Sequence, residues 1–221
     1  MKKRIIIYSV LVCILTSLIC FGLFDLILKT RYKNNEITFR VNNDDAFFVA
    51  SGEYYYGDTS EPTKTYSAQY IQEEYYSGKQ VTISPWNIGE SKFVNDDDNP
   101  NNNVKTLTYV INIKNANSER NLAINLLSVA AHKTPYFYTE ISYKNADNDE
   151  ITKFSNNPDN LVLNDLYYNP VTNPTKVNIT EKEVVGSNKS LQITIKLTLN
   201  TRTKSFTVDN NFILELESIA K

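Results

Sequence analysis

Few residues of this chain belong to the types that carry catalytic or metal chemistry. The sequence has a single histidine, His132, and two cysteines, Cys13 and Cys20, both of which lie in an apolar run near the N-terminus. Zinc sites and Ser-His-Asp or Cys-His catalysis need histidine or cysteine clusters that this composition does not supply. Carboxylate catalysis stays open with 25 acidic residues, but no pair stands out by its spacing. We therefore expect a protein that is not an enzyme and that needs no cofactor.

One acidic run has the composition of a calcium loop. Residues 95–103 place the carboxylates of Asp96, Asp97 and Asp98 among six asparagine and proline residues. Carboxylate and amide oxygens are the ligands that Ca²⁺ prefers, but the run lacks the glycine and the distal glutamate of an EF-hand loop. A solvated hinge is the alternative interpretation, so the three aspartates are outside candidates for calcium. A second acidic run, 145–150, is expected at the tip of a hairpin between Tyr143 and Ile151.

Aromatic side chains are the most distinctive feature of the composition. The chain holds 15 Tyr and 10 Phe, and several tyrosines are direct neighbours. Because successive side chains of a strand point to opposite faces, each neighbouring pair puts at least one ring on an outer face. Such rings can stack on sugars or pack on a partner protein, whereas the alternative is that tyrosine is simply a good strand residue. The candidate ligand-binding residues are Tyr54, Tyr55, Tyr56, Tyr75, Tyr76, Tyr136 and Tyr138.

The apolar run that holds both cysteines is long enough to cross a bilayer. Uncharged residues extend from position 5 to position 24 behind Lys2, Lys3 and Arg4, and a helix of about 20 residues spans the hydrocarbon layer. The exit has no small-residue cleavage triplet, which favours an uncleaved signal anchor over secretion after signal cleavage. The expected organisation is a cytoplasmic tail at 1–4, a transmembrane anchor at 5–28, a linker at 29–36 and an extracytoplasmic domain at 37–221.

The charge of the chain is divided unevenly between the anchor and the rest. Five of the 23 basic residues but only one of the 25 acidic residues lie in the first 31 positions, so the remainder has a net charge of −6. An acidic domain argues against nucleic acid as a partner. Long polar domains are translocated largely regardless of nearby charges. We expect a single-pass protein of the plasma membrane with its C-terminal domain outside the cell, and a reversed anchor is the alternative.

Beyond residue 32 the hydrophobic pattern has a period of two residues. Apolar and polar residues alternate through 105–114, 190–199 and 212–217, which gives each strand one apolar and one wet face. Further strands are expected at 37–41, 46–56, 80–84, 122–130, 136–143, 151–154, 177–180 and 205–208, whereas 65–76 and 160–168 could each form a short helix. The sequence predicts an all-β fold, a two-sheet antiparallel β-sandwich of the immunoglobulin-like or jelly-roll kind, behind one N-terminal transmembrane helix.

The layout of the chain resembles the camelysin and TasA group, a family of surface and biofilm-matrix proteins of Gram-positive bacteria with a jelly-roll sandwich. The features that carry the resemblance are the apolar segment that ends at 22–25, the segments 37–39, 89–90, 107–117 and 122–129, and the closing strands 191–199 and 212–218. The resemblance implies a membrane-anchored structural or adhesive surface protein that associates with itself or with a cell-surface or matrix partner. The alternative is a carbohydrate- or ligand-binding module that uses exposed tyrosines.

Camelysin-type proteins carry a metallopeptidase label, so the resemblance also raises the question of zinc chemistry. Zinc hydrolases typically hold the metal with three protein ligands dominated by histidine. Because His132 is the only histidine, this chain cannot supply such a ligand set.

Overall fold

The computed structural model describes residues 35–42, 46–71, 80–86, 91–130, 136–145, 149–162, 166–167, 176–179, 181–202, 205–208 and 211–221. One group of strands comprises β1 (Asn35–Val41), β4 (Gln80–Trp86), β7 (Asn121–Ala130), β10 (Leu166–Tyr167), β11 (Lys176–Ile179), β12 (Glu183–Val185) and β15 (Asn211–Ile219). A second group comprises β2 (Phe48–Tyr56), β3 (Lys64–Ile71), β6 (Thr106–Asn115), β8 (Phe137–Asn145), β9 (Ile151–Ser155) and β13 (Ser190–Leu199). The strands β5 (Ser91–Phe93) and β14 (Phe206–Val208) pair with each other, and Pro100–Asn102 form a 3₁₀ turn.

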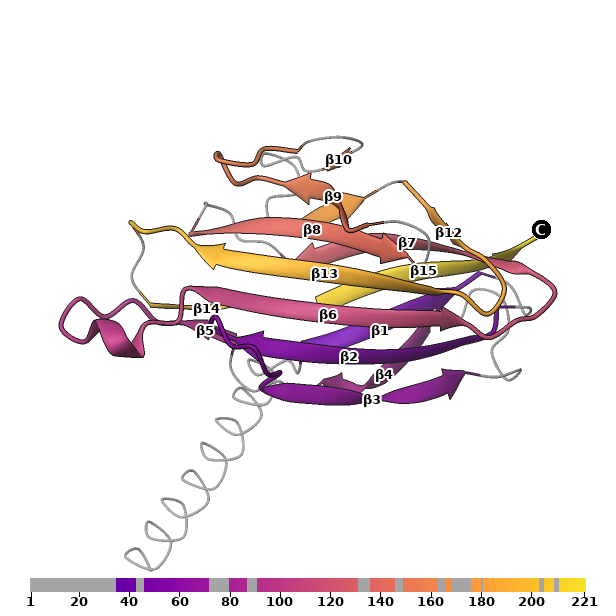
Figure 1. Cartoon of the computed structure of the whole chain (residues 1–221), viewed down its shortest axis with the longest axis horizontal. Helices are drawn as coiled ribbons and strands as arrows, with labels where there is room; N and C mark the ends of the chain where they lie inside the picture. Colours follow the sequence, from indigo (N-terminus) through magenta and orange to yellow (C-terminus); the bar gives the residue numbers. More distant parts are fainter. Residues whose placement is uncertain are drawn as a thin grey trace, which may run out of the picture. The chain divides into compact units, whose positions relative to one another are not determined.

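The two groups of strands form two sheets that pack face to face (Figure 1). The first sheet has the strand order β10-β11-β7-β15-β1-β4, and β12 also pairs with β7. The second sheet has the order β3-β2-β6-β13-β8-β9. Every pair in these sheets is antiparallel except β1 with β15, which run parallel. The described residues therefore confirm the predicted all-β, two-sheet architecture.

Each expected strand is a strand in the structure, but the described part of 65–76, a segment that could form a short helix, is a strand as well. Residues 64–71 form β3, which pairs with β2 along its length. Cross-strand pairing of this kind outweighs the weak local preference on which the helix was predicted. In the other segment, 160–168, the pair Leu166–Tyr167 is strand β10. The expected anchor at 5–28 lies outside the described residues, and the described sandwich begins at Asn35.

The core lies between the two sheets and is built by strict alternation. Strand β13 buries five aliphatic side chains on one face, while its polar residues stay half-buried or exposed on the other. Aromatic rings join the layers: Tyr109 of β6 packs against Phe212 of β15 with ring centroids 5.0 Å apart, and Phe39 of β1 packs against Phe48 of β2 at 5.1 Å. The buried residues of β13 are Leu191, Ile193, Ile195, Leu197 and Leu199.

The buried side chain of Asn115 ties the end of one sheet to the other. Asn115, the last residue of β6, donates from Nδ2 to the carbonyl oxygens of Arg120 at 2.9 Å, Val185 at 3.2 Å and Gly186 at 3.2 Å. Its Oδ1 accepts the backbone N–H of Asn117 at 3.0 Å, which fixes the turn that leads to β7. Because buried polar groups are costly when they lack partners, one side chain satisfies several backbone groups where the chain crosses between sheets.

Replacement of Asn115 by alanine is expected to lower the free energy of unfolding by about 3 kcal/mol, since buried carbonyls lose their donor. Replacement by the isosteric aspartate is expected to cost at least as much, because a carboxylate can only accept hydrogen bonds and would face the same carbonyl oxygens. Chemical denaturation measures both variants. The matched control is Asn112→Ala on the outer face of the same strand, and equal losses at both positions would contradict the role given to Asn115.

Candidate functional site

The tyrosine triplet of β2 is divided between the core and the surface. Tyr54 is buried, and its ring centroid lies 4.9 Å from that of Tyr109. Tyr56 is partly buried and packs against the same core. Tyr55, between them, is half-exposed on the outer face of the second sheet. Successive side chains of a strand point to opposite faces, so both neighbours of Tyr55 face inward. Of these three candidates only Tyr55 offers its ring to a surface ligand.

The other tyrosine candidates are scattered. Tyr138 is half-buried on the outer face of β8, where its hydroxyl accepts a hydrogen bond from Asn200 Nδ2 at 3.3 Å. Tyr136 is exposed just ahead of that strand. By strand spacing, Tyr55 and Tyr138 lie about 15 Å apart on one face. Tyr75 and Tyr76 lie outside the described residues, as does His132.

A groove of about 350 Å³ opens beside Tyr55 on the outer face of the second sheet. Its walls come from β2, β6 and β13 and from the turn that follows β2. The lining residues are Glu53, Tyr55, Gly57, Asp58, Thr59, Thr108, Val110, Gln192 and Lys196.

Strand register brings these distant residues together. Tyr55 lies opposite Thr108, which in turn lies opposite Lys196, so one row of outward side chains crosses three strands. Glu53 lies opposite Val110 in the adjacent row. The sequence gives the outward orientation of each residue through its place in the alternation, but it does not give the register. The sequence therefore pointed to Tyr55 as a candidate but not to the residues that line the groove with it.

Hydrogen bonds hold the polar groups of the groove in place. The Tyr55 hydroxyl donates to Glu53 Oε2 at 2.7 Å, and this bond raises the pKa of Tyr55, so the phenol stays neutral. Thr106 Oγ1 donates to Asp58 Oδ1 at 2.7 Å, and Gln192 Nε2 donates to Asn112 Oδ1 at 3.0 Å. These bonds position the polar groups of the groove relative to one another.

The turn after β2 shapes one end of the groove. Gly57 has a φ of +83°, a conformation that favours glycine, and its N–H donates to the carbonyl oxygen of Thr106 at 2.9 Å. Thr63 Oγ1 accepts the backbone N–H of Tyr56 at 3.0 Å, and Thr59 Oγ1 donates to the carbonyl oxygen of Glu61 at 2.9 Å. These bonds fix Asp58 and Thr59 relative to the sheet.

Asp96 of the aspartate run forms hydrogen bonds within its own loop. Asp96 Oδ1 accepts the backbone N–H groups of Asp98 at 3.0 Å and Asn99 at 3.2 Å, while Asp97 and Asp98 are exposed. In the part of the chain that the structure describes, no three His, Cys, Asp or Glu side chains come together as a metal site. The geometry is that of a side chain that closes a turn.

The described strands on either side of the second acidic run pair with each other. Tyr143 of β8 pairs with Ile151 of β9 across an antiparallel hairpin, which confirms the hairpin that the run was expected to join. Of its residues, 146–148 lie outside the described ones.

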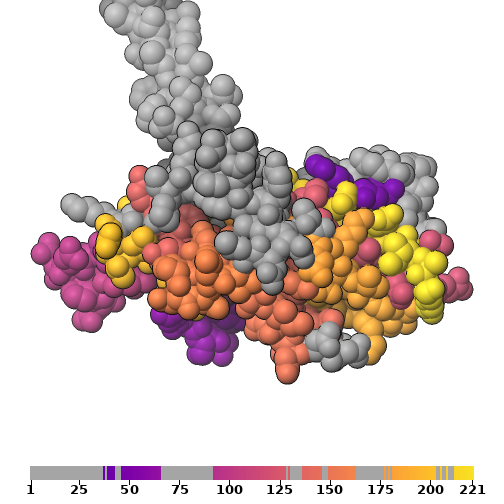
Figure 2. Space-filling model, turned by 90° about the horizontal axis from the view of Figure 1, so that it is seen from above, coloured from indigo at the N-terminus to yellow at the C-terminus, as the bar shows by residue number. Residues whose placement is uncertain are grey.

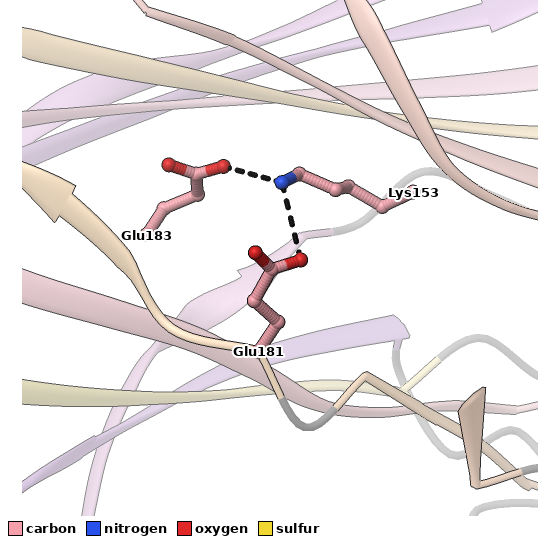
Figure 3. A network of polar contacts seen from close by, with 3 residues as sticks. All are labelled: Lys153, Glu181 and Glu183. Carbon is pink, nitrogen blue, oxygen red and sulfur yellow. Dashed lines mark hydrogen bonds and ion pairs between the residues drawn. The ribbon is translucent and has the colours of Figure 1, made fainter. Parts of the chain in front are cut away.

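A charged triad joins the edges of the two sheets. Lys153 of β9 places its Nζ 2.7 Å from Glu183 Oε1 and 3.3 Å from Glu181 Oε2, as Figure 3 shows. The same Nζ lies 5.8 Å from the centroid of the Tyr143 ring. Figure 2 looks onto this edge, where orange residues from this part of the chain form much of the visible surface. Because Glu183 belongs to β12 of the first sheet and Lys153 to the second, the triad connects the layers.

A β-bulge makes this contact possible. Ile141 pairs with Phe154 and Ser142 with Thr152, so Lys153 is the extra residue of β9. Its side chain is only 14% exposed. Burial lowers the pKa of Lys153, but the hydrogen bonds and charges of Glu183 and Glu181 outweigh this effect and raise it. The triad is a structural clamp between the sheets.

No protein-family model matches the chain, and no curated protein matches it. Among the described residues, no helix combines the length and the apolar character that a membrane crossing needs. The anchor predicted from the sequence lies outside those residues.

Lys153→Met is expected to lower the free energy of unfolding by about 1–2 kcal/mol at neutral pH, because two carboxylates lose a shared cation. The folded pKa of Lys153 lies above the unfolded value of 10.5. The stabilisation is therefore fully present below that pH and disappears as the pH rises through the folded pKa. Denaturation of both proteins at neutral pH and at a pH above the folded pKa measures the difference in their free energies of unfolding. A difference that grows at alkaline pH would contradict the role of the triad as a clamp.

Proposed function

We propose that this protein is a membrane-anchored structural or adhesive protein of the bacterial cell surface, similar to the camelysin and TasA group. The observation that carries the proposal is the edge of the second sheet formed by β3. Among the described strands, β3 pairs with β2 alone and ends the strand order of the second sheet. A strand at the end of a sheet is where a strand of another molecule can add by backbone pairing. A surface protein that assembles or adheres through its backbone needs such an edge.

The other sheet edges are less suited to accept a strand. At the opposite edge of the same sheet, Ser155 of β9 exchanges two backbone hydrogen bonds with Val162, at 2.9 and 3.0 Å, so the following loop covers part of this edge. In the first sheet, β4 carries Pro85 and β10 has two residues. Proline and short strands are common means of protecting an edge. Strand β3 has eight residues and no proline.

The geometry of β3 also limits what it can bind. A register shift opposite Ala50 and Gly52 divides its pairing with β2 into two stretches of three residue pairs. Such bulges increase the local twist of a strand. An added strand would therefore pair over a short length, which suits reversible adhesion or assembly supported by further contacts.

The finer fold assignment that goes with this proposal is a jelly-roll sandwich. The connections from β6 to β7, from β7 to β8 and from β13 to β15 pass from one sheet to the other. Repeated crossing between layers is typical of Greek-key and jelly-roll folds rather than of meanders. The apolar run at 5–24 would hold this domain at the membrane, and its net negative charge suits an extracytoplasmic, soluble surface.

A Gram-positive host that displays the full-length chain is expected to aggregate or to retain matrix material more than cells without it. Ser67→Lys, which adds a charge to the β3 edge, is expected to reduce the effect several-fold, because edge charges oppose strand addition. Thr152→Lys on β9 is the matched control and is expected to leave it unchanged. Equal surface display of all three proteins is checked by antibody labelling.

Two results would contradict this proposal. One is a full-length chain that is displayed but has no effect on aggregation or retention. The other is an effect that Ser67→Lys and Thr152→Lys change equally, which would place the contact away from β3.

A further inference from the structure

We propose that the groove beside Tyr55 is a binding site for a neutral saccharide. The proposal goes beyond the structural or adhesive function, because it concerns the face of the second sheet rather than its β3 edge and names the ligand class. It rests on the size of the groove, on a pre-organised aromatic ring and on the balance of charges around that ring.

The size of the groove suits a small ligand. Its volume of about 350 Å³ lies at the lower end of the range for small-molecule sites, about 300–1,000 Å³. Val110 forms part of the floor of the groove but is itself only 8% exposed, so the accessible lining is mostly polar. A ligand of one or two sugar rings matches this space.

The Tyr55 ring is a fixed platform. Its hydroxyl donates a hydrogen bond to Glu53, two residues away on the same face of β2, and this bond favours one orientation of the ring. Pre-organisation of this kind reduces the entropic cost of binding. The apolar face of a pyranose ring can stack on such an aromatic surface, while its hydroxyl groups reach the polar groups around it.

The polar groups match hydroxyl chemistry. Glu53, Asp58 and Gln192 each make one hydrogen bond within the protein and keep further acceptor capacity. Lys196 adds a donor to the same lining. A sugar hydroxyl both donates and accepts, so it can use acceptors and donors together.

The charges of the lining argue against ionic ligands. An anion would meet the carboxylates of Glu53 and Asp58, and a cation would meet the ammonium group of Lys196. Mixed charge with fixed polar groups therefore favours a neutral, polyhydroxylated ligand. The groove lies on one sheet face, so a saccharide chain can also extend beyond it.

The test uses the full-length chain in a zwitterionic detergent without sugar head groups. A printed array of neutral hexose and N-acetylhexosamine oligosaccharides identifies a binding oligosaccharide, and calorimetric titration with that compound measures its affinity. We expect saturable binding that Tyr55→Ala weakens at least about tenfold, since stacking and the ordered ring are both lost. Tyr55→Phe keeps the ring and is expected to weaken binding less. Tyr136→Ala, an exposed tyrosine outside the groove, is the control.

Circular dichroism establishes that each variant keeps its fold. The proposal is overturned if no neutral oligosaccharide binds, if only charged glycans bind, or if Tyr55→Ala and Gln192→Ala bind as well as the parent. Absence of saccharide binding in a protein that still promotes cell aggregation would reject this site alone and leave the structural or adhesive function standing.

Discussion

The burial of alternate side chains between two sheets is the constraint on which the rest of the structure depends. Strand β13 alternates buried and outer side chains along its whole length, and its neighbours β6 and β8 pair with it residue by residue. Once the inner face of a strand is fixed, its outer face is fixed as well, because a shift by one residue would exchange the two. The position of Tyr55 at the surface is therefore a consequence of the burial of Tyr54 and the packing of Tyr56 against the core.

Polar contacts complete the sandwich where apolar packing cannot. Asn115 satisfies backbone carbonyls at a crossing between the layers, and the triad of Lys153, Glu181 and Glu183 joins two sheet edges. In the described chain these contacts link elements far apart in sequence. Both cysteines lie at positions 13 and 20, so the domain cannot contain a disulfide. The two sheets are held together by buried apolar side chains and by such polar contacts.

The strands could be predicted from the sequence, but their partners could not. Period-two alternation reveals that 190–199 is a strand with Ile195 inside, because the pattern is local. The parallel pairing of β1 with β15 joins the two ends of the domain and leaves no local pattern. The sequence of β3 also permits a short helix, because its strand character depends on pairing with β2.

In the candidate site, too, the local pattern predicts some features, and the others depend on strand pairing. Alternation alone turns Tyr55 outward, whereas Asp58 and Gln192 join it only through turn geometry and register across three strands. In the sequence, Lys153 looks like an ordinary strand residue. The bulge that gives β9 one extra residue at this position has no signal in a single sequence.

The central claim is that the β3 edge accepts a strand from another molecule, and amide hydrogen exchange tests it most directly. Exchange is measured on the full-length chain dispersed in detergent and on cells that display it and have aggregated. The account predicts that amides of residues 64–71 gain protection in the aggregated state, while those of β13 are protected in both. Unchanged exchange at 64–71, with protection gained at β9 or β4 instead, would contradict it.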